Sequence, residues 1–326
     1  MIEEIKKMPK VELHIHLDGS ISLELAEKLS NNSITLIKEK MIARDKCENL
    51  SEYLTKFEFP ISLMQTKENL IKVAKDLVYR LSNQNVIYVE VRFAPMFHTK
   101  NGLTYEEIID SVLLGLNANP NIKTNLILCM MRGFSKEDNL KTIEIAKKYL
   151  GKGVCALDLA GDENKYPLDE YIDLFEIAKK NKIPFTIHAG ENGDAHEVKK
   201  AINCGAKRIG HGIHAIESEE VIKLIKEKNI LLEVCPTSNV QTNAISKYEN
   251  HPLKELYKKN ILVSLNTDNS TVSNISLNEE YLKTWKYFQF NLKDYYKMNI
   301  DAINASFITN KEKKDLLKKI NDFISF

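Results

Sequence analysis

The chain alternates eight short apolar runs with longer amphipathic segments, and this alternation constrains its fold more than any other feature. The short runs are rich in β-branched residues and favour strands, whereas the longer segments show the spacing of apolar residues that is typical of helices. Eight βα units predict an α/β fold, a closed (β/α)8 TIM barrel, although an open doubly wound sheet is also compatible with the pattern. The expected strands cover residues 11–17, 85–94, 124–131, 154–160, 184–189, 208–212, 230–236 and 261–267, and the expected helices include 104–117, 135–150, 168–181, 218–229 and 251–260.

The segment from about 21 to 84 interrupts this alternation, because it holds several helical patterns between the first and second strands where one would suffice. We expect a helical insertion that lies over one end of the barrel as a lid. No linker rich in proline, glycine or serine divides the sequence, and its composition does not change sharply. Residues 1–326 are therefore expected to form a single domain.

Acidic and basic residues balance along the chain. The 46 Lys and Arg and the 45 Asp and Glu give a formal net charge of +1, which offers no global attraction for nucleic acid or an anionic membrane. The sequence contains no uncharged apolar run of about 18 residues, and its first ten residues lack the apolar core of a secretory signal. We expect a cytoplasmic protein with a small-molecule partner, without nucleic acid or membrane partners, and the sequence leaves the oligomeric state open.

Histidine and aspartate side chains gather at the ends of the expected strands, where barrel enzymes keep their active sites. His14 and His16 occupy positions i and i+2 of the first strand and therefore point to the same face. His188 ends the fifth strand, His211 follows the sixth and Asp268 follows the eighth. Each residue alone could be a buried, hydrogen-bonded side chain of the core, but their shared position on one rim of the barrel indicates a metal site.

The mixture of imidazoles and one carboxylate suits zinc. A catalytic zinc keeps one coordination position open for water and lowers the pKa of that water to about 7. Glu191 lies three residues beyond His188 and is placed to protonate a substrate as a general acid. His211 is placed to orient the hydroxide or to stabilise developing charge.

Six motifs together closely resemble the adenosine deaminase family, and they occur in the family's order over nearly the whole chain. Each motif falls at an expected strand end, which makes the resemblance specific. The motifs are PKVELHIHLDGS at 9–20, DLAGDE at 158–163, HAGE at 188–191, GHG at 210–212, CPTSN at 235–239 and SLNTD at 264–268.

The resemblance implies a hydrolytic deamination of adenosine, and of 2′-deoxyadenosine, to inosine and ammonia. It assigns one zinc ion to His14, His16, His188 and Asp268, with His16 also contacting the substrate. Glu191 would protonate the purine N1, and His211 would assist the hydroxide that attacks C6.

Further substrate contacts follow from the same resemblance. Gly161 would offer its backbone N–H to the purine N3, where the absence of a side chain permits close approach. Asp18 would accept hydrogen bonds from the ribose, although an aspartate before Gly19 also suits a plain turn. An apolar lid over the nucleoside would contain three residues whose helical spacing is equally compatible with a core position, namely Tyr53, Leu54 and Phe57.

One position departs from the commonest pattern of the family. Many relatives have a second aspartate after the metal-binding one, where it contacts the purine N7, whereas this chain has Asn269. An asparagine amide donates a hydrogen bond without first taking up a proton. We expect an altered affinity or pH dependence and a retained activity.

Several alternatives compete with this assignment. Lactonases and phosphotriesterases resemble the barrel but carry a bridging lysine on the fourth strand, and residues 154–161 contain none. The five cysteines form no CxxC pair, which argues against a thiolate zinc site of the cytidine deaminase type and favours buried, small apolar side chains.

Within the family, the substrate is less tightly defined. Adenine deaminases tend to have glutamate at the position of Asp18, which favours a nucleoside here, and a 5′-methylthioadenosine deaminase remains an alternative. Nucleotides are disfavoured because no cluster of the five arginines adjoins the motifs. A catalytically silent purine-binding protein would have lost a metal ligand or the proton donor, and all of them are present.

Overall fold

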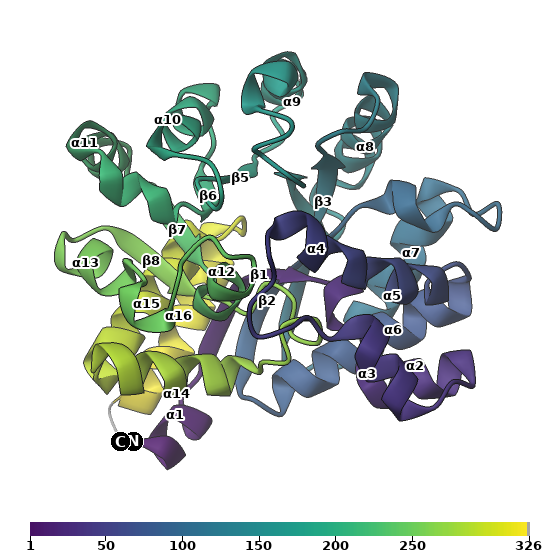
Figure 1. Ribbon diagram of the computed structural model, residues 1–326, viewed down its shortest axis with the longest axis horizontal. Coiled ribbons are helices and arrows are strands. Elements are labelled where there is room, and N and C mark those ends of the chain that lie inside the picture. The colour runs from purple at the N-terminus through teal and green to yellow at the C-terminus, as the bar shows by residue number, and fades with distance from the viewer. Residues whose placement is uncertain (325–326) are drawn as a thin grey trace.

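Eight parallel strands form the centre of the molecule, with helices arranged around them (Figure 1). The computed structural model describes residues 1–324, so the last two residues of the expected domain lie outside the described part. Strands β1 to β4 pair in order, as do β5 to β8. Bridges between Leu157 and Phe185 and between Ile15 and Asp268 join the two sheets at both seams, which closes the barrel. The strands are β1 Lys10–His16, β2 Val86–Phe93, β3 Lys123–Met131, β4 Val154–Ala160, β5 Thr186–Ala189, β6 Arg208–His211, β7 Leu231–Val234 and β8 Leu262–Leu265.

The predicted (β/α)8 barrel is confirmed, but its last four strands are shorter than expected. The eighth strand was expected to include Asn266 and Thr267, which lie beyond β8. There, side chains replace part of the ladder between β8 and β1: Asn266 Oδ1 accepts from the Leu13 N–H at 2.8 Å, and the Thr267 N–H donates to Glu12 at 2.8 Å. Polar side chains thus close this seam next to the strand ends.

Most of the α-helices begin at a side-chain cap. Thr104 and Glu107 form a capping box at the start of α7, and α10 and α11 end at Gly205 and Asn229 in the left-handed conformation. The helices are α1 Ile2–Lys7, α2 Leu23–Ser30, α3 Ile34–Met41, α4 Leu50–Leu54, α5 Glu58–Leu63, α6 Lys67–Ser82, α7 Tyr105–Leu116, α8 Lys136–Tyr149, α9 Ile172–Lys180, α10 Ala195–Cys204, α11 Glu219–Lys228, α12 Pro236–Gln241, α13 Leu253–Lys258, α14 Leu277–Phe288, α15 Leu292–Ala305 and α16 Asn310–Ile324, with short 3₁₀ turns η1 Asp18–Ser20, η2 Thr55–Phe57, η3 Pro95–His98, η4 Leu168–Tyr171, η5 Ile213–Glu217 and η6 Tyr248–Asn250.

The expected insertion lies between β1 and β2 and contains α2 to α5 before the barrel helix α6. Backbone hydrogen bonds tie it to the loops that follow β7 and β8: Cys47 N–H donates to the Gln241 carbonyl and Ala43 N–H to the Val272 carbonyl, each at 2.9 Å. Tyr53 packs into the small apolar cluster formed there. The insertion therefore lies over the carboxyl ends of the strands, where α4 is seen near the centre of Figure 1.

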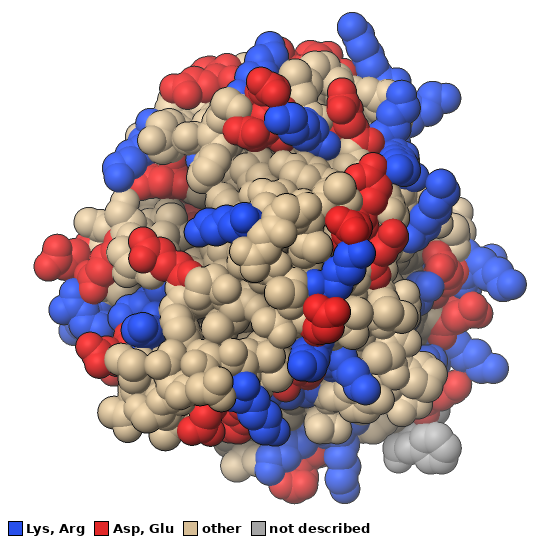
Figure 2. Space-filling model, turned by 90° about the vertical axis from the view of Figure 1, so that its right-hand side faces the viewer, with Lys and Arg blue, Asp and Glu red and all other residues tan. Residues whose placement is uncertain are grey.

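The outer surface carries charges of both signs. Figure 2 shows acidic and basic side chains interspersed over one side of the molecule, the side on which α2, α6 and α7 lie. None of the helices within residues 1–324 combines the length and the apolar character of a membrane span. All five cysteines are buried and unpaired, as expected.

Candidate metal and catalytic site

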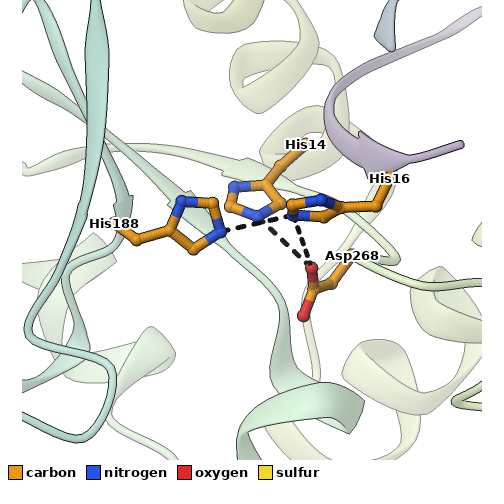
Figure 3. Close-up of side chains that lie close together, drawn as sticks. All are labelled: His14, His16, His188 and Asp268. Atoms are coloured by element: carbon orange, nitrogen blue, oxygen red, sulfur yellow. Dashed lines mark hydrogen bonds and ion pairs between the residues drawn. The ribbon is translucent and has the colours of Figure 1, made fainter. Parts of the chain in front are cut away.

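Four predicted ligands converge at the carboxyl end of the barrel (Figure 3). His14 and His16 alternate with Ile15 on β1 and so face the interior together, while His188 reaches them from β5. The Nε2 atoms of His16 and His188 lie 3.3 Å apart, and the Nε2 atoms of His14 and His16 each lie 3.4 Å from Asp268 Oδ1. One ligand atom from each of the four residues lies within 4.8 Å of all the others.

The chemistry of this cluster fits a bound cation. His14 Nε2 is buried and makes no hydrogen bond, a costly state that coordination to a metal ion would relieve. Burial lowers the pKa of His16 well below its usual value, so the ring is neutral and keeps a lone pair for coordination. Asp268 adopts a left-handed backbone (φ 61°), a strained conformation that turns its carboxylate toward the histidines.

Buried carboxylates hold two of these histidines from behind. Glu233 Oε2 on β7 lies 2.8 Å from His14 Nδ1, and Asp158 Oδ2 on β4 lies 2.9 Å from His188 Nδ1. Such contacts fix the ring orientation and leave Nε2 free to bind a metal. Sequence reasoning did not identify either contact.

Arg92 on β2 links the two carboxylates, donating to Asp158 at 2.8 Å and to Glu233 at 2.7 Å. Burial alone would raise the pKa of both acids, but the positive charges around them outweigh it and hold each pKa well below its usual range. Arg208 binds the other oxygen of Glu233 at 2.6 Å. The barrel interior beneath the site is thus a network of ion pairs. In the sequence, each of its members is visible as a charged residue within an expected strand.

Glu191 lies beside the metal cluster without belonging to it. Its Oε2 is 3.7 Å from His211 Nε2, and Thr242 donates to its Oε1 at 3.1 Å. Burial, followed by the nearby charges of Asp268 and Glu163, raises the pKa of Glu191 well above its ordinary value. A carboxyl group in this environment is suited to deliver a proton.

The loop that carries Glu191 is anchored by Glu163, a residue of the DLAGDE motif for which the sequence offered no role. The Glu163 carboxylate accepts four consecutive backbone N–H groups of residues 190–193, at 2.6 to 2.8 Å. One oxygen, Oε1, accepts three of them. Glu163 is 4% exposed, so little water competes for these donors.

A cavity of about 900 Å³ opens above the cluster. His14 lies fully buried below this cavity. The other predicted site residues all line it, namely His16, Asp18, Tyr53, Leu54, Phe57, Gly161, His188, Glu191, His211, Asp268 and Asn269.

The predicted substrate-contacting residues differ in their surroundings. Burial raises the pKa of Asp18 to about 7. Gly161 has a φ of +107°, which disfavours any side chain. Tyr53 is buried with its hydroxyl 2.7 Å from Ser273 Oγ, whereas Leu54 is 37% exposed at the edge of the cavity.

Asn269 is buried at the cavity wall, and its Oδ1 has no hydrogen-bond partner. A Cβ atom at Gly19 would lie 2.0 Å from this oxygen, so the glycine is what allows Asn269 to sit there.

Arg132 also lines the cavity, a proximity that the sequence did not reveal. Its guanidinium donates to the backbone carbonyls of Tyr166 at 2.6 Å and His188 at 2.9 Å and is therefore engaged by the protein itself.

A histidine and aspartate cluster with a buried carboxyl group beside it, placed at the carboxyl end of a (β/α)8 barrel, defines a metal-dependent hydrolase. Comparison with known proteins narrows this class. The family model described as adenosine deaminase matches residues 9–323, and the chain belongs to the adenosine deaminase family.

Relatives and solved structures agree with this membership. The chain is 41% identical to the adenosine deaminase of Clostridium perfringens (strain ATCC 13124), over 95% of this chain and 97% of that one. It is 44% identical to the adenosine deaminase of Clostridium botulinum (strain Hall), over 96% and 97%. Among solved structures, an adenine deaminase from Arthrobacter aurescens has the same fold (TM-score 0.89, 23% identity, 98% of this chain and 100% of that one). The N6-methyl-AMP deaminase of Arabidopsis thaliana is similarly close (TM-score 0.87, 25% identity, 99% and 98%).

Proposed function

We propose that this chain catalyses the hydrolytic deamination of adenosine and 2′-deoxyadenosine to inosine or deoxyinosine and ammonia. The observation that carries the proposal is the position of Glu191, a buried acid with a raised pKa beside a three-histidine, one-aspartate cluster. Relatives more than 40% identical over 95% or more of this chain carry the name adenosine deaminase, which supports adenosine as the substrate.

The proposed cofactor is one zinc ion held by His14, His16, His188 and Asp268. Zinc bound there would act as a Lewis acid and would lower the pKa of a water molecule to about 7. Imidazoles and a single carboxylate are ligand types that zinc prefers, and strand β4 carries no lysine to bridge a second ion.

The protein's own groups account for the remaining chemistry. Glu191, whose pKa is raised well above its ordinary value by burial and nearby carboxylates, would donate its proton to the purine N1, which makes C6 more electrophilic. His211 would contact the oxygen that attacks C6. Asn269 would donate from its side-chain amide to N7, and the Gly161 N–H would donate to N3.

The sugar and the outer part of the cavity involve different residues. Asp18 would accept a hydrogen bond from a ribose hydroxyl. The insertion would cover the nucleoside with Tyr53, Leu54 and Phe57. All four residues line the cavity, and this room for a sugar supports a nucleoside over a free base. The same proposal treats residues 1–326 as one catalytic domain, because α4 and η2 line the cavity together with residues from the barrel.

The test is the change in ultraviolet absorbance when adenosine becomes inosine. Purified, zinc-loaded protein is expected to produce this change, and removal of the metal with a chelator is expected to abolish it until zinc is restored. Adenosine, 2′-deoxyadenosine, adenine, 5′-methylthioadenosine and AMP are compared side by side. A kcat/KM that is higher for adenine than for adenosine would overturn the nucleoside assignment, and no turnover of any of the five would overturn the proposed function.

A further inference from the structure

The segment from Cys235 to Thr242, which contains the CPTSN motif and α12, contacts the site through three side chains. Ser238 Oγ donates to Asp268 Oδ2 at 2.6 Å, Thr242 holds Glu191, and Asn239 Nδ2 lies 3.0 Å from His211 Nδ1. The first two contacts orient groups whose roles are already described. The third contact determines what His211 can do.

A chain of hydrogen bonds runs from a backbone amide to His211. The Leu253 N–H donates to His251 Nδ1 at 3.1 Å, so the proton of His251 lies on Nε2. His251 Nε2 in turn lies 3.1 Å from Asn239 Oδ1, and the amide group of Asn239 is therefore oriented with Nδ2 toward His211. His211 Nδ1 receives this donor and must carry a lone pair.

We propose that Asn239, oriented by His251, holds His211 in the neutral tautomer with its proton on Nε2, so that His211 acts on the attacking oxygen as a hydrogen-bond donor and not as a base. The Nε2 atom of His211 lies 3.7 Å from Glu191 Oε2, and both residues line the cavity. An imidazole nitrogen that already carries a proton accepts none, and a fixed donor stabilises and orients the negative charge of the attacking oxygen before it adds to C6. This inference rests on the proposed function and assigns positioning roles to Asn239 and His251.

The alternative tautomer is disfavoured along the whole chain of hydrogen bonds. A proton on His211 Nδ1 would face the amide N–H of Asn239, and rotating that amide would turn its N–H toward the N–H of His251. Moving the proton of His251 to Nδ1 would then oppose the Leu253 N–H, a backbone donor that does not change. Asn239, His211 and His251 are 0%, 1% and 4% exposed, so water cannot relieve such a mismatch.

The charge state of His251 agrees with this orientation of the hydrogen bonds. Burial lowers the pKa of His251 to about 3, so this ring has a single proton to place. His211 also has a left-handed backbone (φ 61°), a strained conformation of the kind that clusters at active sites.

The test reads the tautomer directly and does not depend on turnover. Zinc-loaded protein labelled with ¹⁵N at its eight histidines is examined by NMR, with two-bond proton to nitrogen correlations that distinguish protonated from unprotonated ring nitrogens. The variant His211→Gln identifies the signals of His211, and His214→Gln serves as the matched control on the adjacent turn. We expect wild-type His211 to carry its proton on Nε2 alone, and a proton on Nδ1 or on both nitrogens would overturn the proposal.

Three variants test this chain of hydrogen bonds. Asn239→Asp replaces the donor by an acceptor, so we expect the proton to move to Nδ1 and kcat to fall about 100-fold, with KM changed less than threefold. If Asn239→Asp does not fold, His251→Leu and His251→Gln give the same information, because only glutamine keeps a donor for Asn239. We expect His211 to lose the Nε2 tautomer in His251→Leu and to keep it in His251→Gln. The same His211 tautomer and the same kcat in both variants would contradict the proposed chain of hydrogen bonds. If His211 has the expected tautomer but adenosine is not deaminated, the proposed function fails while the tautomer assignment stands.

Discussion

The substitution Glu163→Gln tests whether a single buried carboxylate holds the loop that carries Glu191. In the native protein this carboxylate accepts the N–H groups of Gly190, Glu191, Asn192 and Gly193. Glutamine is nearly isosteric. It keeps one acceptor oxygen, but its amide nitrogen turns a donor toward one of the four N–H groups.

The magnitude follows from the number and kind of these hydrogen bonds. A hydrogen bond to a charged acceptor contributes about 1.5–3 kcal/mol and one to a neutral acceptor about 0.5–1.5 kcal/mol, so three weakened bonds and one lost bond amount to roughly 4.5–7.5 kcal/mol. A neutral amide costs less to bury than a carboxylate, which offsets part of this loss. We expect the free energy of unfolding to fall by about 2–4 kcal/mol.

Urea denaturation of zinc-loaded protein measures this free energy, and steady-state kinetics with adenosine measures the effect on the site. Because the loop positions Glu191, we expect kcat to fall by at least about tenfold while the zinc content stays near one per chain. The matched control is Glu170→Gln, an exposed glutamate on η4 whose replacement is expected to change stability by less than about 0.5 kcal/mol. A Glu163→Gln variant as stable and as active as this control would refute the assigned role of Glu163.

Three further predictions concern single residues. Glu191→Gln is expected to abolish turnover and to retain about one zinc by metal analysis, whereas Asp268→Ala is expected to lose the metal; a metal-free Glu191→Gln protein would place Glu191 among the ligands. Asn269→Asp is expected to raise KM for adenosine about fivefold to tenfold, since an ionised aspartate has no proton to donate to N7, and an unchanged KM and pH profile would show that this residue does not touch the base. Burial lowers the pKa of His98 to about 4 from an ordinary 6.5, so between these pH values the unfolded chain binds more protons than the folded one. The contribution of His98 to the free energy of unfolding is therefore complete above pH 6.5 and falls by up to about 3 kcal/mol as the pH drops to 4. His98→Asn, which keeps a donor for the Met64 carbonyl, is expected to flatten this part of the stability curve in urea titrations, and an unaltered curve would exclude His98 as its source.

The barrel and the convergence of its polar residues were predictable from local patterns. The spacing of apolar residues that distinguishes strands from helices can be recognised in short stretches of sequence, and eight βα units can form a parallel sheet in few ways. Because the carboxyl ends of parallel strands meet at one rim, placing His14, His188 and Asp268 at strand ends was enough to predict that they lie together. The exact ends of β5 to β8 were not predictable, since side chains such as Asn266 take over from the backbone ladder there.

The sequence by itself determined the fold class, the set of candidate ligands and the candidate proton donor Glu191, because each of these depends on residue type and on position within a repeating unit. Only the tertiary structure decided which side chains orient them. Glu163 accepts hydrogen bonds from residues 190–193, and Asn239 is hydrogen-bonded to His211. Arg92 forms ion pairs with Asp158 and Glu233. Each of these contacts joins different βα units. Such contacts depend on hydrogen-bond direction and on distances of about 3 Å, which no spacing along one chain encodes.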